Sequence, residues 1–247
     1  MSERISPSNR TALITGAARR IGKAIALALA DDGWQVVIHH NASCDDAGRL
    51  ADEIRSKGGE AKTIQCDLAD PAAHSTLIAK CEKLDVRPTC LINNASAFFE
   101  DLPQGLSAEV WDAHMNTNLR APVFLASYLA NQLPSDATGN IINIIDQRVL
   151  RPRPEFFSYT LSKSALLTAT QTLAQTLAPR IRVNAIAPGP TLQSVHQSAE
   201  DFAEEVAATP LHRPCGLDEI AAAVRLILAC PSMTGQMITL DSGQHLV

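Results

Sequence analysis

A tyrosine and a lysine one helical turn apart are the residues of this chain best suited to acid–base chemistry. Tyr159 and Lys163 stand at positions i and i+4 of a helical pattern, so both side chains face the same side of the helix. An ammonium group beside a phenol favours the phenolate, which predicts a lowered pKa for Tyr159 and proton transfer near neutral pH. The spacing also occurs by chance on the surface of amphipathic helices. Asp146, upstream of the pair, places a carboxylate at the end of the preceding apolar strand.

A glycine-containing loop follows the first apolar run of the chain. Residues 11–15 form this run, and residues 15–22 then read Thr-Gly-Ala-Ala-Arg-Arg-Ile-Gly. Small residues let the backbone approach a pyrophosphate closely, and the helix that follows begins with unpaired N–H groups that bind anions. A pair of glycines at a strand end also occurs in plain turns. Its place directly after the first strand favours a dinucleotide-binding loop.

The second apolar strand ends in residues 39–43, His-His-Asn-Ala-Ser, without an aspartate or glutamate. An acid there would bind the ribose 2′-hydroxyl of NAD and repel the 2′-phosphate of NADP. Its absence, with Arg19 and Arg20 in the adjacent loop and Ser43 at the strand end, predicts NADP(H) as the cofactor. The alternative is that both arginines are solvated surface charges. Asp67, after the third strand, is predicted either to bind the adenine amino group or to cap the next helix.

Apolar runs alternate with helical patterns along the whole chain. The runs are continuous, as is typical of a parallel sheet covered by helices on both faces. This predicts an α/β fold with strands near residues 11–15, 36–38, 62–67, 90–93, 139–146, 182–187 and 237–241. Helices are predicted near residues 21–32, 45–57, 71–84, 108–131, 159–177 and 217–229. Pro122 is expected to bend or break the long helix that contains it.

Residues 191–215 interrupt this alternation. The segment is polar, is helical only in its middle, and ends with Pro210 and Pro214. It is longer than the usual connection inside a compact domain. These features predict a mobile lid over the site rather than a linker.

Length and composition exclude several classes of protein. The 247 residues fit one domain, and 46% hydrophobic with 19% charged residues is ordinary for a globular protein. The net charge of −5 gives no basic field for nucleic acid or an anionic membrane, and no apolar run reaches the length of about 18–20 residues that spans a bilayer. The six cysteines lack metal-ligand spacing and the start of the chain lacks a signal-peptide pattern, which predicts a cytoplasmic protein without a metal.

Several motifs resemble those of the short-chain dehydrogenase/reductase family, in the same order along essentially the whole chain. They are residues 15–22, 93–96, Asn118, Tyr159 with Lys163, 184–190 and 241–243. The resemblance implies one Rossmann-type domain over residues 1–247, a doubly wound parallel sheet of seven strands with helices on both faces, and a homotetramer. It also implies these cofactor contacts: Gly16, Arg19, Arg20, Ile21, His40, Asn41, Ser43, Asp67, Leu68, Asn94, Ala95, Ser96, Tyr159, Lys163, Pro188 and Gly189.

Three departures from the usual family pattern resemble the pteridine reductases and the related dihydromonapterin and dihydrofolate reductases. Arg20 replaces the middle glycine of the loop, Ser96 replaces a glycine after the fourth strand, and Asp146 stands where the family has its catalytic serine. An ionised carboxylate cannot donate a hydrogen bond to a carbonyl oxygen, but it accepts from the N–H donors of a pterin. Phe98 is expected to stack on the flat ring. The expected substrate contacts are therefore Arg20, Ser96, Phe98, Asp146 and Tyr159.

The resemblance implies an NADPH-dependent reduction of a ring C=N bond in a pterin or dihydropterin. Tyr159 is expected to give a proton to the ring nitrogen, while Lys163 lowers its pKa and holds the nicotinamide ribose. Asn118 is expected to keep a chain of waters, and Asp146 to orient both Tyr159 and the substrate. Three of these residues have a plainer explanation: Phe98 as ordinary core or pocket wall, Asp146 paired with a nearby arginine such as Arg148, and Arg20 on cofactor phosphate alone. Two other functions remain open: a carbonyl or 3-oxoacyl reductase that tolerates the aspartate, and an NADPH-binding protein without catalysis.

Overall fold

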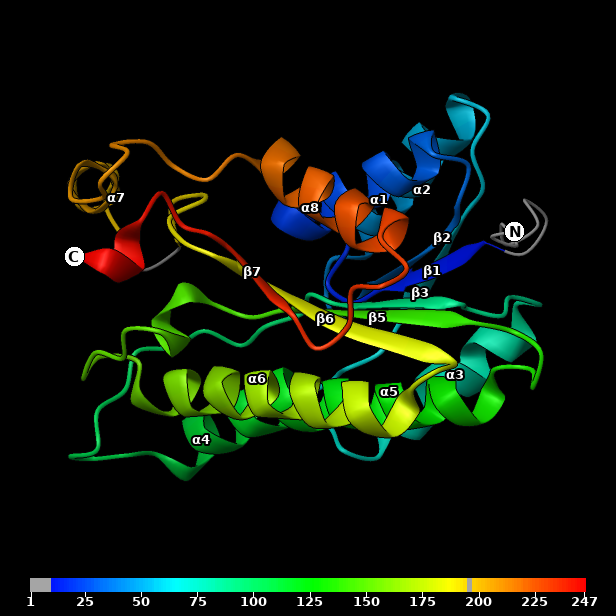
Figure 1. Cartoon of the computed structure of the whole chain (residues 1–247), viewed down its shortest axis with the longest axis horizontal. Helices are drawn as coiled ribbons and strands as arrows, with labels where there is room; N and C mark the ends of the chain where they lie inside the picture. The colour runs from blue at the N-terminus through cyan, green and yellow to red at the C-terminus, as the bar shows by residue number, and fades with distance from the viewer. Residues whose placement is uncertain (1–9, 195–196) are drawn as a thin grey trace.

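Seven short strands, each rich in aliphatic residues, form one parallel sheet in the centre of the protein (Figure 1). A computed structural model describes residues 10–194 and 197–247. The strands are β1 (Thr11–Ile14), β2 (Gln35–His40), β3 (Ala61–Gln65), β4 (Cys90–Asn93), β5 (Gly139–Ile144), β6 (Ile181–Pro188) and β7 (Met237–Leu240). Their order across the sheet is β3-β2-β1-β4-β5-β6-β7, and every pairing is parallel. The predicted seven-stranded Rossmann-type sheet is confirmed.

Helices cover both faces of the sheet, as Figure 1 shows. One layer consists of α1 (Arg20–Asp31), α2 (Cys44–Ser56) and α8 (Leu217–Ala229). The other consists of α3 (Ala73–Lys83), α4 (Ala108–His114), α5 (Ala121–Gln132) and α6 (Phe157–Leu177). Separate hydrophobic clusters form on the two faces because successive strand residues point to opposite faces: Ile14 packs with the first layer and Leu13 with the second. None of the described helices is long and apolar enough to cross a membrane.

The long helical stretch around Pro122 changes its winding before the proline. Helix α4 runs into a π-helical turn, η2 (Met115–Arg120), and α5 then begins with Pro122 in its first turn. A proline is tolerated there because the first N–H groups of a helix lack intrahelical acceptors. A break at Pro122 is not seen, because residues 108–132 are helical without a gap; the winding changes instead in the π turn before the proline. Asn118 lies in this turn, and π turns of this kind are frequent at functional sites.

The carboxyl ends of the strands meet at one end of the molecule. Helix α7 (Ala199–Ala207) and the short helix η4 (Gln244–Leu246) lie at this end, together with the start of α6 (Figure 1). The strand order reverses between β1 and β4, which is where parallel sheets of this type bind ligands. Helix α7 occupies the middle of the segment 191–215, as the sequence predicts, while residues 195–196 of that segment lie outside the described residues.

Candidate active site

The hydroxyl of Tyr159 donates a 2.8 Å hydrogen bond to Oδ2 of Asp146. Asp146 follows β5, and Tyr159 lies in the first turns of α6, where its side chain is buried. The other carboxylate oxygen of Asp146, Oδ1, accepts a 2.8 Å bond from the backbone N–H of Arg148. The carboxylate therefore pairs with the main chain of Arg148, while its guanidinium lies over the ring of Phe156, 5.0 Å from the centroid.

The ionisation of this pair differs from the sequence-based expectation. Burial, followed by the charge of Asp146 and its hydrogen bond, raises the pKa of Tyr159 well above its usual value. The expected lowering by Lys163 is therefore wrong for the protein without ligands, because the carboxylate beside the phenol opposes the phenolate. Burial also raises the pKa of the Asp146 carboxyl. Both pKa values are thus raised, and the Tyr159 hydroxyl donates its hydrogen bond to the Asp146 carboxylate.

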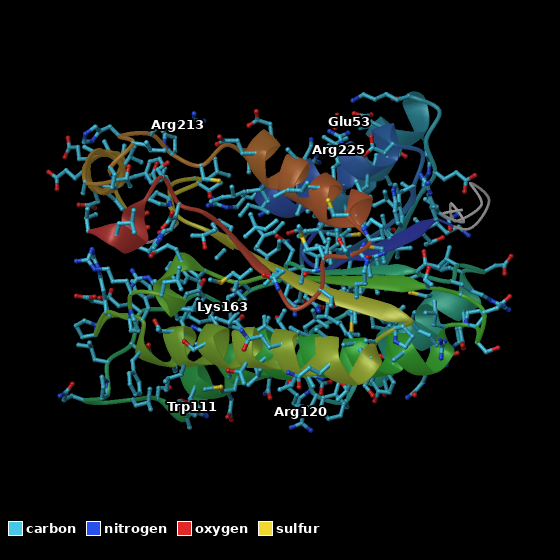
Figure 2. The ribbon with its side chains drawn as sticks, viewed as in Figure 1. Glu53, Trp111, Arg120, Lys163, Arg213 and Arg225 are labelled. Atoms are coloured by element: carbon cyan, nitrogen blue, oxygen red, sulfur yellow. The ribbon has the colours of Figure 1, made fainter. Side chains whose placement is uncertain are left out.

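Lys163 lies between α6 and the sheet (Figure 2). Its Nζ donates a 2.9 Å hydrogen bond to the backbone carbonyl of Ile144 and lies 5.7 Å from the centroid of the Tyr159 ring. Burial lowers the pKa of Lys163 to about 8, and the charge of Asp146 works against this shift. The ammonium form thus persists at neutral pH. The i, i+4 spacing on α6 places it on the same side of the helix as the phenol.

Asn118 connects the π turn to the segment after β4. Its Nδ2 donates to the carbonyl oxygen of Ala97 at 2.9 Å and to Oγ of Ser162 at 3.1 Å. Its Oδ1 accepts from the backbone N–H of Ala97 at 2.7 Å and from the Ser96 hydroxyl at 3.3 Å. Asn118 is fully buried, so its side chain fixes the start of the segment that carries Phe98.

Phe98 belongs to an aromatic cluster at the mouth of the site. It stacks on Phe156 with ring centroids 4.3 Å apart and an angle of 3°, and its ring meets Tyr159 edge-to-face at 4.7 Å. Phe156 is a residue of the site that was not predicted from the sequence. Its position three residues before Tyr159, at the end of a loop, was the available signal. Phe156 also adopts a left-handed backbone conformation with φ 57°, which is uncommon for a bulky residue and accompanies its packing between Phe98 and Arg148.

The loop after β1 has the geometry of a phosphate cradle. Gly16 has φ 61°, and a Cβ on Gly22 would lie 2.4 Å from the carbonyl oxygen of Gly16 and 2.6 Å from Nδ2 of Asn94. Both positions therefore require glycine. Asn94 Nδ2 closes the loop by donating to the carbonyl oxygens of Thr15 and Gly16 at 2.9 and 3.0 Å.

Arg20 stands at the first residue of α1 with φ 53°. This left-handed conformation explains why the family pattern has glycine at the position. The guanidinium of Arg20 donates to the carbonyl oxygens of Leu192 and Gln193 at 3.0 and 2.9 Å. Arg20 thus joins the phosphate loop to the start of the segment 191–215.

Arginine side chains gather where the second strand meets the phosphate loop. Arg19 and Arg49 both form ion pairs with Asp46, in the first turn of α2, and both are largely exposed. Ser43 directly precedes α2 and makes no side-chain cap to that helix among the described residues. Of the predicted group, only Arg19 pairs with Asp46 just beyond Ser43, because Arg20 donates instead to Leu192 and Gln193. The nearby acid, Asp46, was not part of the prediction.

The ring of His39 connects the phosphate loop to the segment after β3. Its Nδ1 accepts the backbone N–H of Gly16 at 3.1 Å, and its Nε2 lies 3.0 Å from the carbonyl oxygen of Cys66. A carbonyl oxygen only accepts, so Nε2 carries the hydrogen and the ring is neutral. Burial lowers the pKa of His39 to about 4. The cofactor contact predicted from the sequence is the neighbouring His40, and this role of His39 was not predicted.

The remaining predicted cofactor residues border the same end of the sheet. Asp67 Oδ1 accepts the N–H of Ala69 at 2.9 Å within the turn after β3. The alternative that Asp67 caps the next helix is wrong, because Ala72 is the N-cap residue of α3. His40 is buried and its Nδ1 lies 3.3 Å from the carbonyl oxygen of Asn41. Ile21 lies in the first turn of α1. The others, each at the carboxyl end of a strand or in the segment just beyond it, are Leu68, Ala95, Ser96, Pro188 and Gly189. No group of three or more His, Cys, Asp or Glu among residues 10–194 and 197–247 is arranged to hold a metal ion.

This arrangement defines an α/β protein with a dinucleotide-binding loop and a Tyr–Lys pair at one end of a parallel sheet. The sequence profile of the short chain dehydrogenases matches residues 10–204. A 3-oxoacyl-[acyl-carrier-protein] reductase of Synechocystis sp. is 32% identical over 244 residues, which are 95% of this chain and 96% of that protein. The chain belongs to the short-chain dehydrogenase/reductase family and is an oxidoreductase of that family.

Two solved structures are more similar in sequence than this relative. FolM alternative dihydrofolate reductase 1 from Brucella canis, complexed with NADP, is 48% identical with a TM-score of 0.93, and the match covers 97% of this chain and 95% of that one. The protein of the same name from Brucella suis, also in complex with NADP, is 48% identical with a TM-score of 0.91, covering 97% and 96% of the two chains.

Proposed function

We propose that this protein is an NADPH-dependent reductase of a ring C=N bond in a dihydropterin or dihydrofolate. The observation that carries the proposal is the 2.8 Å hydrogen bond from the Tyr159 hydroxyl to Asp146. In the usual family pattern a serine hydroxyl helps to bind a substrate carbonyl oxygen. A carboxylate at this position repels such an oxygen and accepts hydrogen bonds from the N–H and NH₂ groups of a pterin.

The residues present fit the cofactor. The cradle formed by Gly16 and Gly22 leaves no room for a Cβ, and α1 begins without a side-chain cap from Arg19, so its first N–H groups are available to a pyrophosphate. Arg19 and Ser43 lie at the end of β2 where a 2′-phosphate would sit, and the two FolM structures with NADP support the same assignment. When bound, NADPH supplies the hydride.

The proton for the ring nitrogen comes from the Tyr159–Asp146 pair. Burial raises the pKa of Tyr159 well above its usual value, so the phenol carries its proton at neutral pH and donates it to Asp146 until the substrate takes it. Transfer of this proton adds one negative charge beside the Asp146 carboxylate, and the ammonium of Lys163, 5.7 Å from the Tyr159 ring, offsets it. Asn118 holds Ala97 and Ser162 and so maintains the shape of the site around the phenol.

Phe98 provides the flat apolar face that a bicyclic heterocycle requires. Its edge-to-face contact with Tyr159 at 4.7 Å keeps the aromatic face beside the proton donor. Arg20 and Ser96 lie at the border between the phosphate loop and this face and are proposed to contact both ligands. The segment 191–215, joined to Arg20 through Leu192 and Gln193, is proposed to cover the site.

The test is a comparison of substrates under identical conditions. NADPH oxidation is followed with dihydrobiopterin, dihydrofolate and an acetoacetyl thioester, using the native enzyme, Tyr159→Phe and Asp146→Ser. We expect turnover of the bicyclic compounds, a loss of about 10²–10⁴-fold in Tyr159→Phe, and intact NADPH binding in both variants. Asp146→Ser is expected to weaken pterin reduction much more than NADPH binding. Brisk turnover of the thioester without turnover of any pterin would refute the proposal.

The second candidate is a 3-oxoacyl thioester reductase, which the 32% identical Synechocystis relative favours. The same assay distinguishes the two, because a β-keto thioester offers a carbonyl oxygen and no ring N–H donors. An intact Tyr159, Lys163 and Asn118 argue against a protein that binds NADPH without catalysis.

A further inference from the structure

His114, Ser158 and Asp101 form a buried chain of hydrogen bonds beside the proton donor. Nδ1 of His114 lies 2.6 Å from Oγ of Ser158, and the Ser158 hydroxyl in turn donates to Oδ2 of Asp101. Nε2 of His114 accepts the backbone N–H of Phe99 at 3.0 Å. His114 and Ser158 are fully buried, and the mechanism proposed above uses none of the three.

The direction of each bond follows from the donors available. The N–H of Phe99 can only donate, so Nε2 of His114 carries a lone pair and the hydrogen of the neutral ring is on Nδ1. This hydrogen points to Ser158, whose own hydrogen goes to the carboxylate of Asp101. Burial lowers the pKa of His114, which agrees with the neutral ring. The order differs from that of a hydrolytic triad, because the serine hydroxyl faces the carboxylate and is not activated by the imidazole.

This chain repeats the contacts of Asn118 one helical turn away. Asn118 links Ala97 to Ser162, and His114 links Phe99 to Ser158. His114 and Asn118 are four residues apart, as are Ser158 and Ser162, so each pair lies on one side of its helix. Each connection runs from the segment after β4, through the helix formed by α4 and η2, to α6. We call each of these connections a rung.

The rung through His114, Ser158 and Asp101 also fixes the start of α6. The backbone N–H of Ser158 lies 3.2 Å from both carboxylate oxygens of Asp101, and the N–H of Phe157 donates to the Asp101 carbonyl at 3.2 Å. Phe156, which precedes the helix, has no side chain able to cap it. Asp101 therefore serves as the cap from a distant part of the chain, and its charge suits the positive end of the helix.

We infer that the His114–Ser158–Asp101 rung is a positioning device that sets Phe98 against Tyr159. The rungs hold the main chain at residues 97, 99 and 101, on either side of Phe98, and Ser158 directly precedes Tyr159. The ring of His114 also meets the Tyr159 ring edge-to-face, with centroids 5.9 Å apart, so the 4.7 Å distance between Phe98 and Tyr159 depends on how this connection is held. This inference deepens the proposed function, because Phe98 and Tyr159 are its substrate face and proton donor.

The experiment compares Ser158→Ala with Thr170→Val. Both variants remove a buried hydroxyl of α6, but Thr170 bonds to Asn143 and Leu166, away from the rung. We expect Ser158→Ala to lower kcat/KM about 10- to 100-fold, as a misplaced donor does, with NADPH affinity unchanged. Thr170→Val is expected to lower the Tm without a comparable loss of kcat/KM. Ser158→Thr, which retains the hydroxyl, is expected to restore activity.

A second readout does not depend on the substrate. The chain has two tyrosines, Tyr128 and Tyr159, so ring-labelled tyrosine gives a spectrum of two residues. The Tyr159 ring signals, shifted by the nearby face of Phe98, are expected to move in Ser158→Ala and to stay in place in Thr170→Val. Equal kcat/KM and unmoved ring signals in Ser158→Ala would overturn the inference. If Ser158→Ala does not fold, Asp101→Asn replaces it with the same expected displacement. A native enzyme that reduces only the thioester would refute the pterin assignment, while the ring signals would still decide on the rung.

Discussion

The ammonium group of Lys163 is bonded to the carbonyl oxygen of Ile144 at 2.9 Å, two residues before Asp146 on the same strand end. The strand that presents the carboxylate thus also anchors the cation that balances it. Since β5 lies between β4 and β6 and Ile144 is buried, the carbonyl that holds the ammonium belongs to main chain supported on both sides. The position of Lys163 relative to the phenol is therefore set by the main chain of β5.

Deprotonation of Lys163 should limit activity at alkaline pH. Burial lowers its pKa to about 8, so the charged form is present below that pH and is lost as the pH rises through it. We expect kcat/KM to fall above about pH 8, because kcat/KM reports ionisations of the free enzyme. Tyr159 cannot cause this limb, since its pKa lies well above its usual value. A pH profile of the native enzyme and of Lys163→Arg, which stays charged, tests the assignment; a limb near 8 that persists in the variant would contradict it.

Removal of the Arg20 side chain should loosen the segment 191–215. Arg20→Ala deletes two charge-assisted bonds to the carbonyl oxygens of Leu192 and Gln193, and we expect proteolysis within the segment to become about 5- to 10-fold faster. Arg213→Ala is the matched control, because Arg213 belongs to the same segment but pairs with Glu219. Equal rates in both variants would show that Arg20 does not hold the segment.

The backbone of Arg20 gives a separate prediction. With φ 53°, any residue with a Cβ is strained at this position. Arg20→Gly and Arg20→Ala lose the same side-chain bonds, so they differ only in the backbone. We expect the glycine variant to have a free energy of unfolding about 1 kcal/mol higher than the alanine variant. Chemical denaturation of the two proteins measures this difference, and an alanine variant that is equally or more stable would argue against strain.

Arg19 should favour NADPH over NADH. Arg19 and Arg49 both pair with Asp46 and are similarly exposed, but only Arg19 belongs to the phosphate loop. We expect Arg19→Gln to raise the Kd of NADPH about 10-fold, because a charge-assisted contact to the 2′-phosphate is lost, and to leave the Kd of NADH unchanged. Arg49→Gln is the control. Titration of the fluorescence of both cofactors measures the four constants, and equal weakening by the two substitutions would assign the effect to the release of Asp46.

His39 should make the protein less stable in mild acid. Its pKa falls from an ordinary 6.5 to about 4 on folding, so between these values the unfolded chain binds a proton that the native protein does not. The free energy of unfolding therefore decreases as the pH falls through this window, by about 3 kcal/mol for this group. His39→Asn, which retains an acceptor for the Gly16 N–H but does not titrate, should show a smaller decrease. Thermal unfolding at several pH values compares the two proteins; identical slopes would exclude His39 as the cause.

Much of the fold was accessible from the sequence because strand and helix alternate with distinct hydrophobic patterns. Each predicted strand is present, and the pair of Tyr159 and Lys163 lies where its spacing indicates. Which side chains pack against these residues in space could not be predicted from the sequence. Phe156 meets Phe98 across a separation of about 58 residues, and periodicity shows which side chains face inward but not which ones meet.

The pKa values of the site residues were predicted from the sequence less well than the identity of these residues. The phenol of Tyr159 was expected to be acidified by Lys163, but burial and the carboxylate of Asp146 act in the opposite direction. Such a balance depends on desolvation, which spacing along the chain does not reveal. The homotetramer, the cytoplasmic location and the covering of the site by residues 191–215 stay predictions.

The hydrogen bonds that hold the main chain of the segment after β4 affect how substrate preference can change among relatives. Asn118 and His114 hold Ala97 and Phe99 through main-chain atoms, so the identity of the side chains at residues 98 and 100 is not constrained by these contacts. A substitution of Phe98 can therefore reshape the aromatic wall while the scaffold beneath it keeps its course. Relatives with new substrates can arise by exchange of single residues here, without remodelling the loop that carries them.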